Sequence, residues 1–430
     1  MLSLNCARGS NRIRVLFVRC LSSNADGPKS YDDTVNVPVP RRSAVQSSFK
    51  QGTGGRSSFS GIVTTVFGAT GFTGRYIVNR LGKCGSQIII PYRGDPYDAR
   101  RLRLAGDLGQ VLFFPYHLKD EDAIRKVVKH SNVVINNMGT FFETKNFPFE
   151  YTHVEAARNI ARISREMGVS KLIHVSAMNA SLEPEEHLIP GGSKFLKTKA
   201  LGEIAVREEF PEAIIVRPAT IFGTEDHFVH VYLSPWRRWF HHKIDLWHRG
   251  ADTFIMPIHA TDYASGITNA VFDPTADGQT FEFVGPNCYN FGELVDWMFD
   301  YCHRGKNNKI YARLGFGPVT TMRTNINEYW IKVWKGFTFQ WNWEYLEHVE
   351  CTSDVLTGVP TAEDLGVTNM KDFELFSTTA LSFYDYLGYY TAKLNELPKP
   401  GPLKKYPPLR KPAVAAGEPI YSRMAQSAFV

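Results

Sequence analysis

The sequence predicts an α/β protein, with a doubly wound parallel sheet followed by a smaller C-terminal domain. Three observations lead to this fold class: short strands that are apolar at every residue, helical periodicity between them, and a glycine-rich loop after the first strand. Strands without polar alternation are typical of a parallel sheet that helices cover on both faces. At 430 residues, 43% of them hydrophobic, the chain is long enough for two domains.

The predicted strands and helices alternate along the chain from residue 61. Residues 61–67 are rich in β-branched side chains and form the first strand, and a helix follows at 75–81. The same alternation continues with strands at 87–92, 111–116, 132–137, 171–175 and 213–217 and helices at 120–130, 154–167 and 195–208. We therefore expect a first domain at 61–225 and a smaller C-terminal domain at 226–396.

The two ends of the chain lie outside these domains. Residues 1–25 contain four arginines and no acid, and they form an amphipathic pattern. This composition is typical of a mitochondrial transit peptide, and a basic tail without a targeting role is the alternative. Residues 26–60, rich in serine, proline and glycine, are predicted to be a linker. Residues 397–430 hold seven prolines, six basic residues and one acid, so they form a proline-rich basic tail that lies on a partner or stays free.

Composition excludes several classes of protein. Removing the four arginines of residues 1–25 from the formal charge of +6 leaves +2, which is too small to indicate a nucleic-acid partner. Six cysteines without a C-x-x-C pair argue against a disulfide scaffold and a thiolate zinc site. No apolar run approaches the roughly 18 to 20 residues of a transmembrane helix, so contact with membrane lipid would be peripheral.

A glycine loop at 68–74 joins the first strand to the first helix. Gly68 permits a tight turn, Gly71 lets the backbone approach a pyrophosphate, and Gly74 lets the helix pack closely. The free N–H groups at the helix N-terminus suit phosphate oxygens. We therefore expect residues 61–225 to be a dinucleotide-binding domain, whose loop contacts come from Gly68, Thr70, Gly71, Phe72, Thr73, Gly74 and Arg75.

The residues after the second strand favour NADP(H) over NAD(H). An NAD site usually presents an acid about 20 residues beyond the loop, whereas an NADP site presents an arginine to the 2′-phosphate. This chain has Arg93 at that place, and its planar guanidinium suits a phosphate. Arg75 is a candidate for a second contact. Asp95 follows two residues later and leaves the NAD alternative open, and Arg93 as a solvated loop residue is another alternative.

Several segments at strand ends resemble the extended and atypical members of the short-chain dehydrogenase/reductase superfamily. They are the glycine loop and residues 136–139, 175–177 and 217–223. Residues 257–264 resemble the segment that returns from the substrate domain, so 257–275 is expected to rejoin the first domain. The further cofactor-binding residues that this resemblance implies are Asn137, Ser176, Lys199 and Pro218.

The resemblance also implies that the catalytic centre is degenerate. Active members carry a Tyr-x-x-x-Lys helix, in which the tyrosine moves the substrate proton and the lysine lowers the tyrosine pKa. Lys199 matches the lysine, but Phe195 stands in the place of the tyrosine, and phenylalanine has no titratable proton. The serine position falls at Ser176 or, two residues later, at Met178. The resemblance therefore implies a nucleotide site without catalytic residues; an ordinary surface location for Lys199 is the alternative.

Within the superfamily the chain resembles the NADPH-binding accessory subunits of mitochondrial respiratory complex I. The segments that carry this resemblance are 210–218, 222–228, 281–286 and 363–367. It implies a peripheral subunit on the matrix side of the inner membrane, near the quinone module and the membrane-arm junction, with the other complex I subunits as partners. NADPH would be structural there. The alternatives are a free matrix NADP-dependent reductase or epimerase and a scaffold without nucleotide.

The C-terminal half is predicted to carry a docking surface. Residues 232–243 mix tryptophan with cations, as interfacial segments do. Further tryptophans follow at Trp330, Trp334, Trp341 and Trp343. The alternative is that these tryptophans fill the core of the smaller domain. His117 stands where the superfamily that the chain resembles often has an aspartate facing the adenine, and it is expected to be a satisfied loop residue. The other histidines lack a ligand set with carboxylates, so no metal site is predicted.

Overall fold

A computed structural model of the chain describes residues 50–52, 55–235, 237–239, 243–303, 312–333, 341–385, 387, 390 and 400–411. The predicted transit peptide at 1–25 lies outside these residues. Most of the predicted linker at 26–60 and much of the basic tail at 397–430 lie outside them too, as do Trp334 and part of 232–243. The proposed domain boundaries and the roles of these segments therefore stay predictions.

A seven-stranded parallel sheet forms the framework of the part of the molecule that we call the first half. Its strands come from residues 63–218 and 280–283. Its strands are β1 (Val63–Phe67), β2 (Gln87–Tyr92), β3 (Val111–Pro115), β4 (Val133–Asn136), β5 (Lys171–Val175), β6 (Ile214–Pro218) and β12 (Thr280–Phe283). They lie in the order β12-β6-β5-β4-β1-β2-β3, and all neighbouring pairs are parallel. The chain runs outward from β1 to β3, then returns beside β1 and runs outward in the other direction. The predicted doubly wound sheet is confirmed.

Successive strand residues bury themselves on opposite faces of this sheet. Val66 belongs to one hydrophobic core and Phe67 to the other, and Ile88 and Ile89 divide in the same way. Because side chains alternate along a strand, an uninterrupted apolar run fills both cores at once. The apolar strands of the sequence are therefore the direct cause of the two-sided packing.

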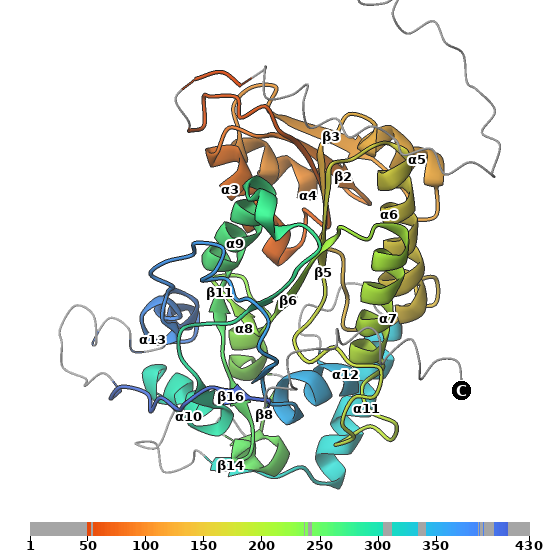
Figure 1. The fold of residues 1–430 in the computed structure, drawn as a ribbon. Coiled ribbons are helices and arrows are strands. Elements are labelled where there is room, and N and C mark those ends of the chain that lie inside the picture. The colour runs from red at the N-terminus through yellow and green to blue at the C-terminus, as the bar shows by residue number, and fades with distance from the viewer. Residues whose placement is uncertain are drawn as a thin grey trace, which may run out of the picture. The chain divides into compact units, whose positions relative to one another are not determined.

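Helices cover both faces. On one side α3 (Phe72–Lys83) packs against α9 (Ala260–Phe272), and on the other α5 (Glu121–Val128) and α7 (Lys194–Glu209) flank α6 (Ala156–Glu166) (Figure 1). A π-helical turn, η3 (Glu150–Glu155), leads into α6. Short helical turns at α4 (Pro96–Arg100) and η2 (Arg101–Ala105) connect β2 to β3. The helices that the periodicity predicts are present within a few residues of the expected bounds.

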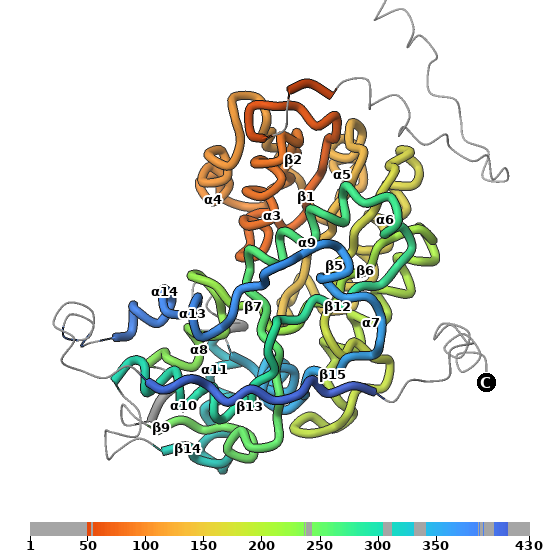
Figure 2. Tube along the Cα trace, turned by 60° about the vertical axis from the view of Figure 1, so that its left-hand side comes forward, coloured from red at the N-terminus to blue at the C-terminus, as the bar shows by residue number. Residues whose placement is uncertain are grey.

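The C-terminal half forms a separate hydrophobic core. Its main helices and turns are α8 (Phe228–Leu233), α10 (Phe291–Tyr301), α11 (Pro318–Val333), α12 (Trp343–Leu346), η6 (Glu347–Cys351), α13 (Phe373–Phe376) and α14 (Thr378–Leu381). Short strands connect them: β7 (Ile221–Phe222), β8 (Arg238–Trp239), β9 (Lys243–Asp245), β10 (Phe254–Ile255), β11 (Ile258–His259), β13 (Tyr289–Asn290), β14 (Ala312–Leu314), β15 (Val355–Leu356) and β16 (Leu409–Arg410). Residues 400–411 cross this half, where Tyr406 pairs with Cys288 (Figure 2). No helix within the described residues is long and apolar enough to span a bilayer.

Residues 342–351, which we call the clamp segment, connect the C-terminal core to the first half. The Glu344 carboxylate accepts hydrogen bonds from the Ser193 hydroxyl and from the backbone N–H of Phe195 at the start of α7. The fully buried Glu347 carboxylate accepts three backbone N–H groups, from His187, Leu188 and Ile189. A carboxylate at a helix N-terminus or inside a cluster of N–H groups is well solvated by the protein.

A third carboxylate of the clamp segment is held in the C-terminal core. Glu350 and Arg237 are 0% and 1% exposed and form an ion pair with an N–O distance of 2.7 Å. The Glu350 carboxylate also accepts a hydrogen bond from the Tyr232 hydroxyl. Burial raises the pKa of Glu350, although the nearby guanidinium opposes this shift. Breaking such a pair from one side leaves a buried charge without its counterion.

Substitution of Glu350 tests how much of the C-terminal fold depends on this pair. We expect Glu350→Gln to lower the free energy of unfolding by about 3–5 kcal/mol, because the Arg237 charge stays buried without its counterion. The double variant Arg237→Met with Glu350→Leu removes both charges, so its free energy of unfolding should fall by less than that of Glu350→Gln. Urea denaturation of the three proteins measures this. A single variant as stable as the wild type would contradict the assignment.

Candidate dinucleotide site

The glycine loop is shaped by two close approaches of backbone. Gly68 has a φ of +76°, and a Cβ atom there would lie 2.5 Å from the Asn137 carbonyl oxygen. A Cβ on Gly74 would lie 2.2 Å from the Gly68 carbonyl oxygen, so α3 packs directly on the loop. Gly71 precedes the helix with a φ of −70°, and a Cβ there would be 3.4 Å from the Gly68 oxygen. The backbone therefore requires Gly68 and Gly74, whereas Gly71 keeps space open beside the helix end.

The N-terminus of α3 has no side-chain cap from the described residues. Its first N–H groups are thus suited to phosphate oxygens. Asn137 fixes the neighbouring loop, because its Nδ2 donates to the Thr73 hydroxyl at 2.9 Å and its Oδ1 accepts from the Tyr263 hydroxyl at 3.1 Å. Arg75 forms an ion pair with Glu225. Its Nε also donates to the Gly71 carbonyl oxygen at 3.3 Å, so Arg75 lies against the glycine loop, and its contact with a phosphate stays a prediction.

Arg93 and its surroundings form the other end of the site. The Arg93 guanidinium lies 4.6 Å from the centroid of the Phe147 ring, and the Lys119 ammonium lies 5.4 Å from the same centroid. Two cations therefore gather around one ring beyond β2 and β3. The Asp95 carboxylate caps α4 by accepting the Tyr97 N–H at 2.8 Å. His117 is exposed, and its Nδ1 accepts the Lys119 N–H at 3.3 Å, which confirms it as a satisfied loop residue.

A cavity of about 220 Å³ lies between the glycine loop and the clamp segment. Its walls come from the ends of β4, β5 and β6, from α7 and from the C-terminal half. The predicted site residues that line it are Phe72, Thr73, Asn137, Ser176, Phe195, Lys199 and Pro218. Residues up to 146 positions apart in the sequence, Phe72 and Pro218, thus meet in one cavity at the C-terminal edge of the sheet, where ligands of such folds bind.

Lys199 is buried, which excludes the alternative of a surface lysine. It is 4% exposed, and its ammonium donates to the carbonyl oxygens of Met138 at 3.2 Å and Val175 at 3.1 Å. Burial lowers its pKa to about 8, although the nearby Glu203 carboxylate opposes the shift. Glu203, one helical turn away, is itself paired with Arg217 at 2.6 Å.

Phe195 lies on the same face of α7 and is packed among aromatic rings. It is 4% exposed, and its ring lies 4.6 Å from Phe141 and 5.4 Å from His153. The Lys199 ammonium is 6.0 Å from the Phe195 ring centroid. Phe195, which the sequence predicts to stand in the place of the proton donor, is therefore part of the apolar wall of the cavity. The role that we infer from this exchange remains a prediction.

The two candidates for the serine position separate in space. Ser176 lines the cavity, and its buried Oγ has no hydrogen-bond partner among the described residues. Met178 instead packs in a small core with Ala219 and Met256. His348, on the clamp segment, also lines the cavity, and sequence reasoning missed it. No local pattern connects a histidine on η6 with a strand end that lies more than 170 residues earlier.

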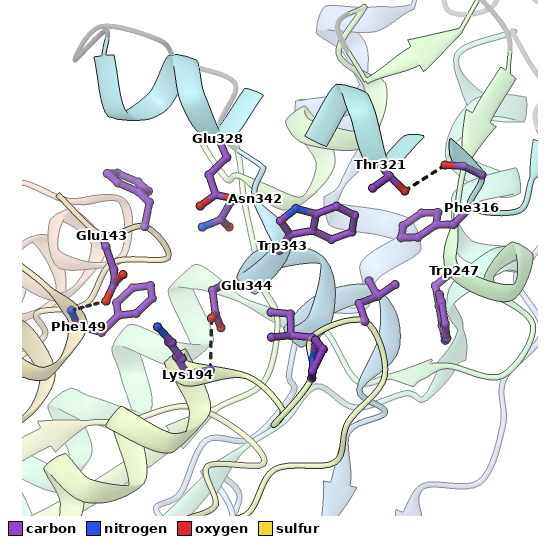
Figure 3. Close-up of a pocket in the computed structure, with 15 residues that line it drawn as sticks. Glu143, Phe149, Lys194, Trp247, Phe316, Thr321, Glu328, Asn342, Trp343 and Glu344 are labelled. Carbon is purple, nitrogen blue, oxygen red and sulfur yellow. Dashed lines mark hydrogen bonds between the residues drawn. The ribbon is translucent and has the colours of Figure 1, made fainter. Parts of the chain in front are cut away.

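A larger cavity of about 620 Å³ lies on another side of the clamp segment (Figure 3). Figure 3 shows Glu344 joined to the backbone of Lys194, and Trp343 beside Phe316. No residue of the glycine loop lines this larger cavity. The clamp segment therefore contributes to both cavities, with Trp343 and Glu344 in one and Tyr345 and His348 in the other.

The predicted docking residues divide between core and surface. Tyr232 and Leu233 are fully buried and Arg237 is paired with Glu350, so the prediction of a surface segment is wrong for these residues. Trp341 is also in the core, whereas Trp330 on α11 is 43% exposed. Among the described residues no group of histidines, cysteines and carboxylates could hold a metal ion.

The fold and the cavity define a Rossmann-type protein of the short-chain dehydrogenase/reductase class. The model of the NAD dependent epimerase/dehydratase family matches residues 64–283, slightly more than half of the chain. The terminal R domain of the myxalamid biosynthetic pathway has a similar structure, with a TM-score of 0.50 and 15% identity over 82% of this chain and 94% of that one. This likeness shows the fold only.

Relatives of known name narrow the family. The mouse (Mus musculus) protein called NADH dehydrogenase (ubiquinone) 1 alpha subcomplex subunit 9, mitochondrial, is 47% identical over 367 residues, which cover 83% of this chain and 89% of the relative. The 40 kDa subunit of NADH-ubiquinone oxidoreductase of Neurospora crassa is 41% identical over 57% of this chain and 61% of its own. The chain belongs to the NAD dependent epimerase/dehydratase family and, within it, to the family of these alpha subcomplex subunit 9 proteins.

Two glycine substitutions separate the requirements of the fold from those of a ligand. Gly74→Ala places a Cβ against the Gly68 carbonyl and should lower the melting temperature, because α3 must move off the loop. Gly71→Val has an allowed φ and a Cβ 3.4 Å from its nearest neighbour, so its melting temperature should change little. Its affinity for a dinucleotide should fall, which titration measures. Unchanged nucleotide binding in Gly71→Val would contradict the phosphate site.

The buried ammonium of Lys199 predicts a pH-dependent stability difference. Its pKa is about 8 in the folded protein and about 10.5 when unfolded, so the unfolded state binds more protons between these values. Relative to Lys199→Met, the wild type should therefore gain stability as the pH rises from 8 to 10.5, by roughly 3 kcal/mol. Urea unfolding of both proteins across this range measures the difference. A constant difference would show that Lys199 titrates as it does in water.

Proposed function

We propose that this protein is an accessory subunit of mitochondrial respiratory complex I that binds NADPH as a structural element and does not turn it over. The names of its relatives support the assignment to complex I and to mitochondria. The observation that carries the non-catalytic role is Phe195, which fills the place of the proton donor with an apolar ring while the dinucleotide site beside it is retained. A site of this kind binds without the acid–base step of the active enzymes.

NADPH in particular is supported by the cations at the adenosine end. Arg93 and Lys119 both lie near Phe147, beyond the strand that ends where the ribose 2′-group would be recognised. The Asp95 carboxylate, which could grip a free ribose hydroxyl, is already used to cap α4. A 2′-phosphate would find two positive charges there, and one oxygen of the Asp95 carboxylate already accepts the Tyr97 N–H.

The bound nucleotide would stabilise the folded subunit. A ligand present at a hundredfold excess over its dissociation constant contributes about 2.7 kcal/mol, which is a large share of the stability of an average domain. We infer a peripheral position on the matrix side of the inner membrane, near the quinone module and the membrane-arm junction, where the other complex I subunits are its partners. This position rests on the family resemblance. It also assigns the subunit a role in assembly.

Native electrophoresis tests this proposal directly. The protein from solubilised mitochondria should migrate with complex I, and denaturation should release NADPH that mass spectrometry identifies. Incubation of the purified complex or of the full chain with carbonyl compounds should leave its bound NADPH unchanged. The rival function, a free matrix reductase or epimerase, predicts a small native size and repeated NADPH oxidation. Release of no nucleotide at all would favour the scaffold.

Substitution of Arg93 tests the choice of nucleotide. Arg93→Ala should weaken NADPH binding about tenfold and leave NADH binding nearly unchanged, since only NADPH carries the phosphate that the guanidinium would pair with. Arg80→Ala, an exposed arginine on α3, is the matched control and should change neither affinity. Calorimetric titration measures both. Equal NADPH affinity in wild type and Arg93→Ala would show that the phosphate assignment is wrong.

A further inference from the structure

Three residues that line the 220 Å³ cavity have a buried polar atom without a hydrogen-bond partner among the described residues: Ser176, Tyr345 and His348. Two of these atoms, the Oγ of Ser176 at the end of β5 and the Nδ1 of His348 on the clamp segment, come from distant parts of the chain. Neither atom has a partner among the residues that the structure describes. Leaving a buried polar atom unsatisfied costs about 1–3 kcal/mol, so such atoms call for an explanation. A ligand that supplies the missing hydrogen bonds is one.

The surroundings of these atoms select a flat, partly polar ligand group. The His348 ring is stacked 5.9 Å from Phe141 and lies 5.3 Å from Phe195. Lys199 lines the same cavity, and its ammonium donates hydrogen bonds to the backbone carbonyl oxygens of Met138 and Val175. The walls are therefore aromatic, and polar atoms occur at a few fixed points. A flat, unsaturated ring that bears one amide group fits this pattern.

His348 is uncharged in this environment. Burial and the neighbouring Lys199 charge lower the pKa of His348 to about 4, so the imidazole is neutral near pH 7. A neutral imidazole has one N–H donor and one acceptor nitrogen, and which nitrogen carries the proton depends on its partners. A carboxamide has both a donor and an acceptor. It therefore complements the imidazole in either tautomer, and the Ser176 hydroxyl can also donate or accept.

We propose that His348 and Ser176 bind the nicotinamide carboxamide of the dinucleotide, so that the nucleotide links the first half of the chain to the C-terminal half. This inference rests on the proposed function, because it requires that a nicotinamide dinucleotide binds. Ser176 comes from the parallel sheet, whereas His348 follows Glu347 and precedes Glu350 on the segment that holds both halves together. The carboxamide would bridge them at this point. Nucleotide occupancy would then be transmitted to the C-terminal half through the clamp segment.

The test compares NADPH with 2′,5′-ADP, which has the adenosine end and no nicotinamide. The variant is His348→Phe in the full-length chain, because phenylalanine keeps a ring next to Phe141 and Phe195. We expect it to weaken NADPH binding about 2- to 10-fold, the value of one buried neutral hydrogen bond, and to leave 2′,5′-ADP binding unchanged. Ser176→Ala should show the same pattern. The fold-loss of NADPH affinity in the double variant should be smaller than the product of the two single fold-losses, since both residues bind one group.

A second measurement separates binding from a general structural effect. In the wild type, NADPH should slow amide hydrogen exchange in residues 342–351, and 2′,5′-ADP should not. In His348→Phe the protection by NADPH should be lost, although the melting temperature without nucleotide stays close to that of the wild type. The variant His130→Phe, at an exposed histidine that follows α5 and lies outside the cavity, serves as the control and should behave like the wild type in every assay.

Each outcome decides the inference. Equal NADPH affinity in wild type and His348→Phe overturns the inference, while the proposed function stands. An equal loss of affinity for NADPH and 2′,5′-ADP also overturns the inference, because His348 would then be merely structural. If the wild type binds neither NADPH nor 2′,5′-ADP, the proposed function fails as well. Selective loss of NADPH affinity together with loss of protection in 342–351 supports the inference.

Discussion

The arrangement of this protein depends on three carboxylates of one short segment. Glu344 accepts hydrogen bonds at the start of α7, Glu347 accepts three backbone N–H groups of residues 187–189, and Glu350 pairs with the buried Arg237. Carboxylates that are taken out of water need such partners, since an unpaired buried charge costs several kcal/mol. Because the three sets of partners come from both halves of the chain, the clamp segment has one place in which all its charges are satisfied.

That placement defines the cavity next to the glycine loop. With the clamp segment in position, Tyr345 and His348 form part of the wall of the cavity. Lys199 then has to be buried, and its ammonium is held by carbonyl oxygens of the two adjacent strand ends. Lys199 and Phe195 thus lie together at the cavity, and the phenylalanine side chain supplies no proton.

A cofactor site in which Phe195 replaces the acid–base residue, as we propose, would agree with a nucleotide that contributes stability. The ligand would form hydrogen bonds with buried polar atoms that have no partner among the described residues, such as the Ser176 hydroxyl. In an active enzyme the same cavity would have to open for a substrate in each cycle. Under the proposed function the subunit has no such requirement, so its C-terminal half would stay closed over the cavity. Exposed surfaces such as α11 would then be available to partners.

Local patterns in the sequence determined the parallel sheet, its helices and the glycine loop. Apolar strands such as 87–92 and the spacing of Gly68, Gly71 and Gly74 act through neighbouring residues, so the sequence shows them directly. Only the tertiary structure decided the contacts between distant segments: the pairing of Arg75 with Glu225, the burial of Tyr232 and Arg237, and the position of His348 at the cavity. Composition predicted residues 232–243 to be a surface segment. A cation beside tryptophans gives the same sequence pattern whether it lies in water or pairs with a buried carboxylate. The partner that resolves this, Glu350, lies more than 100 residues away, and no periodicity connects the two.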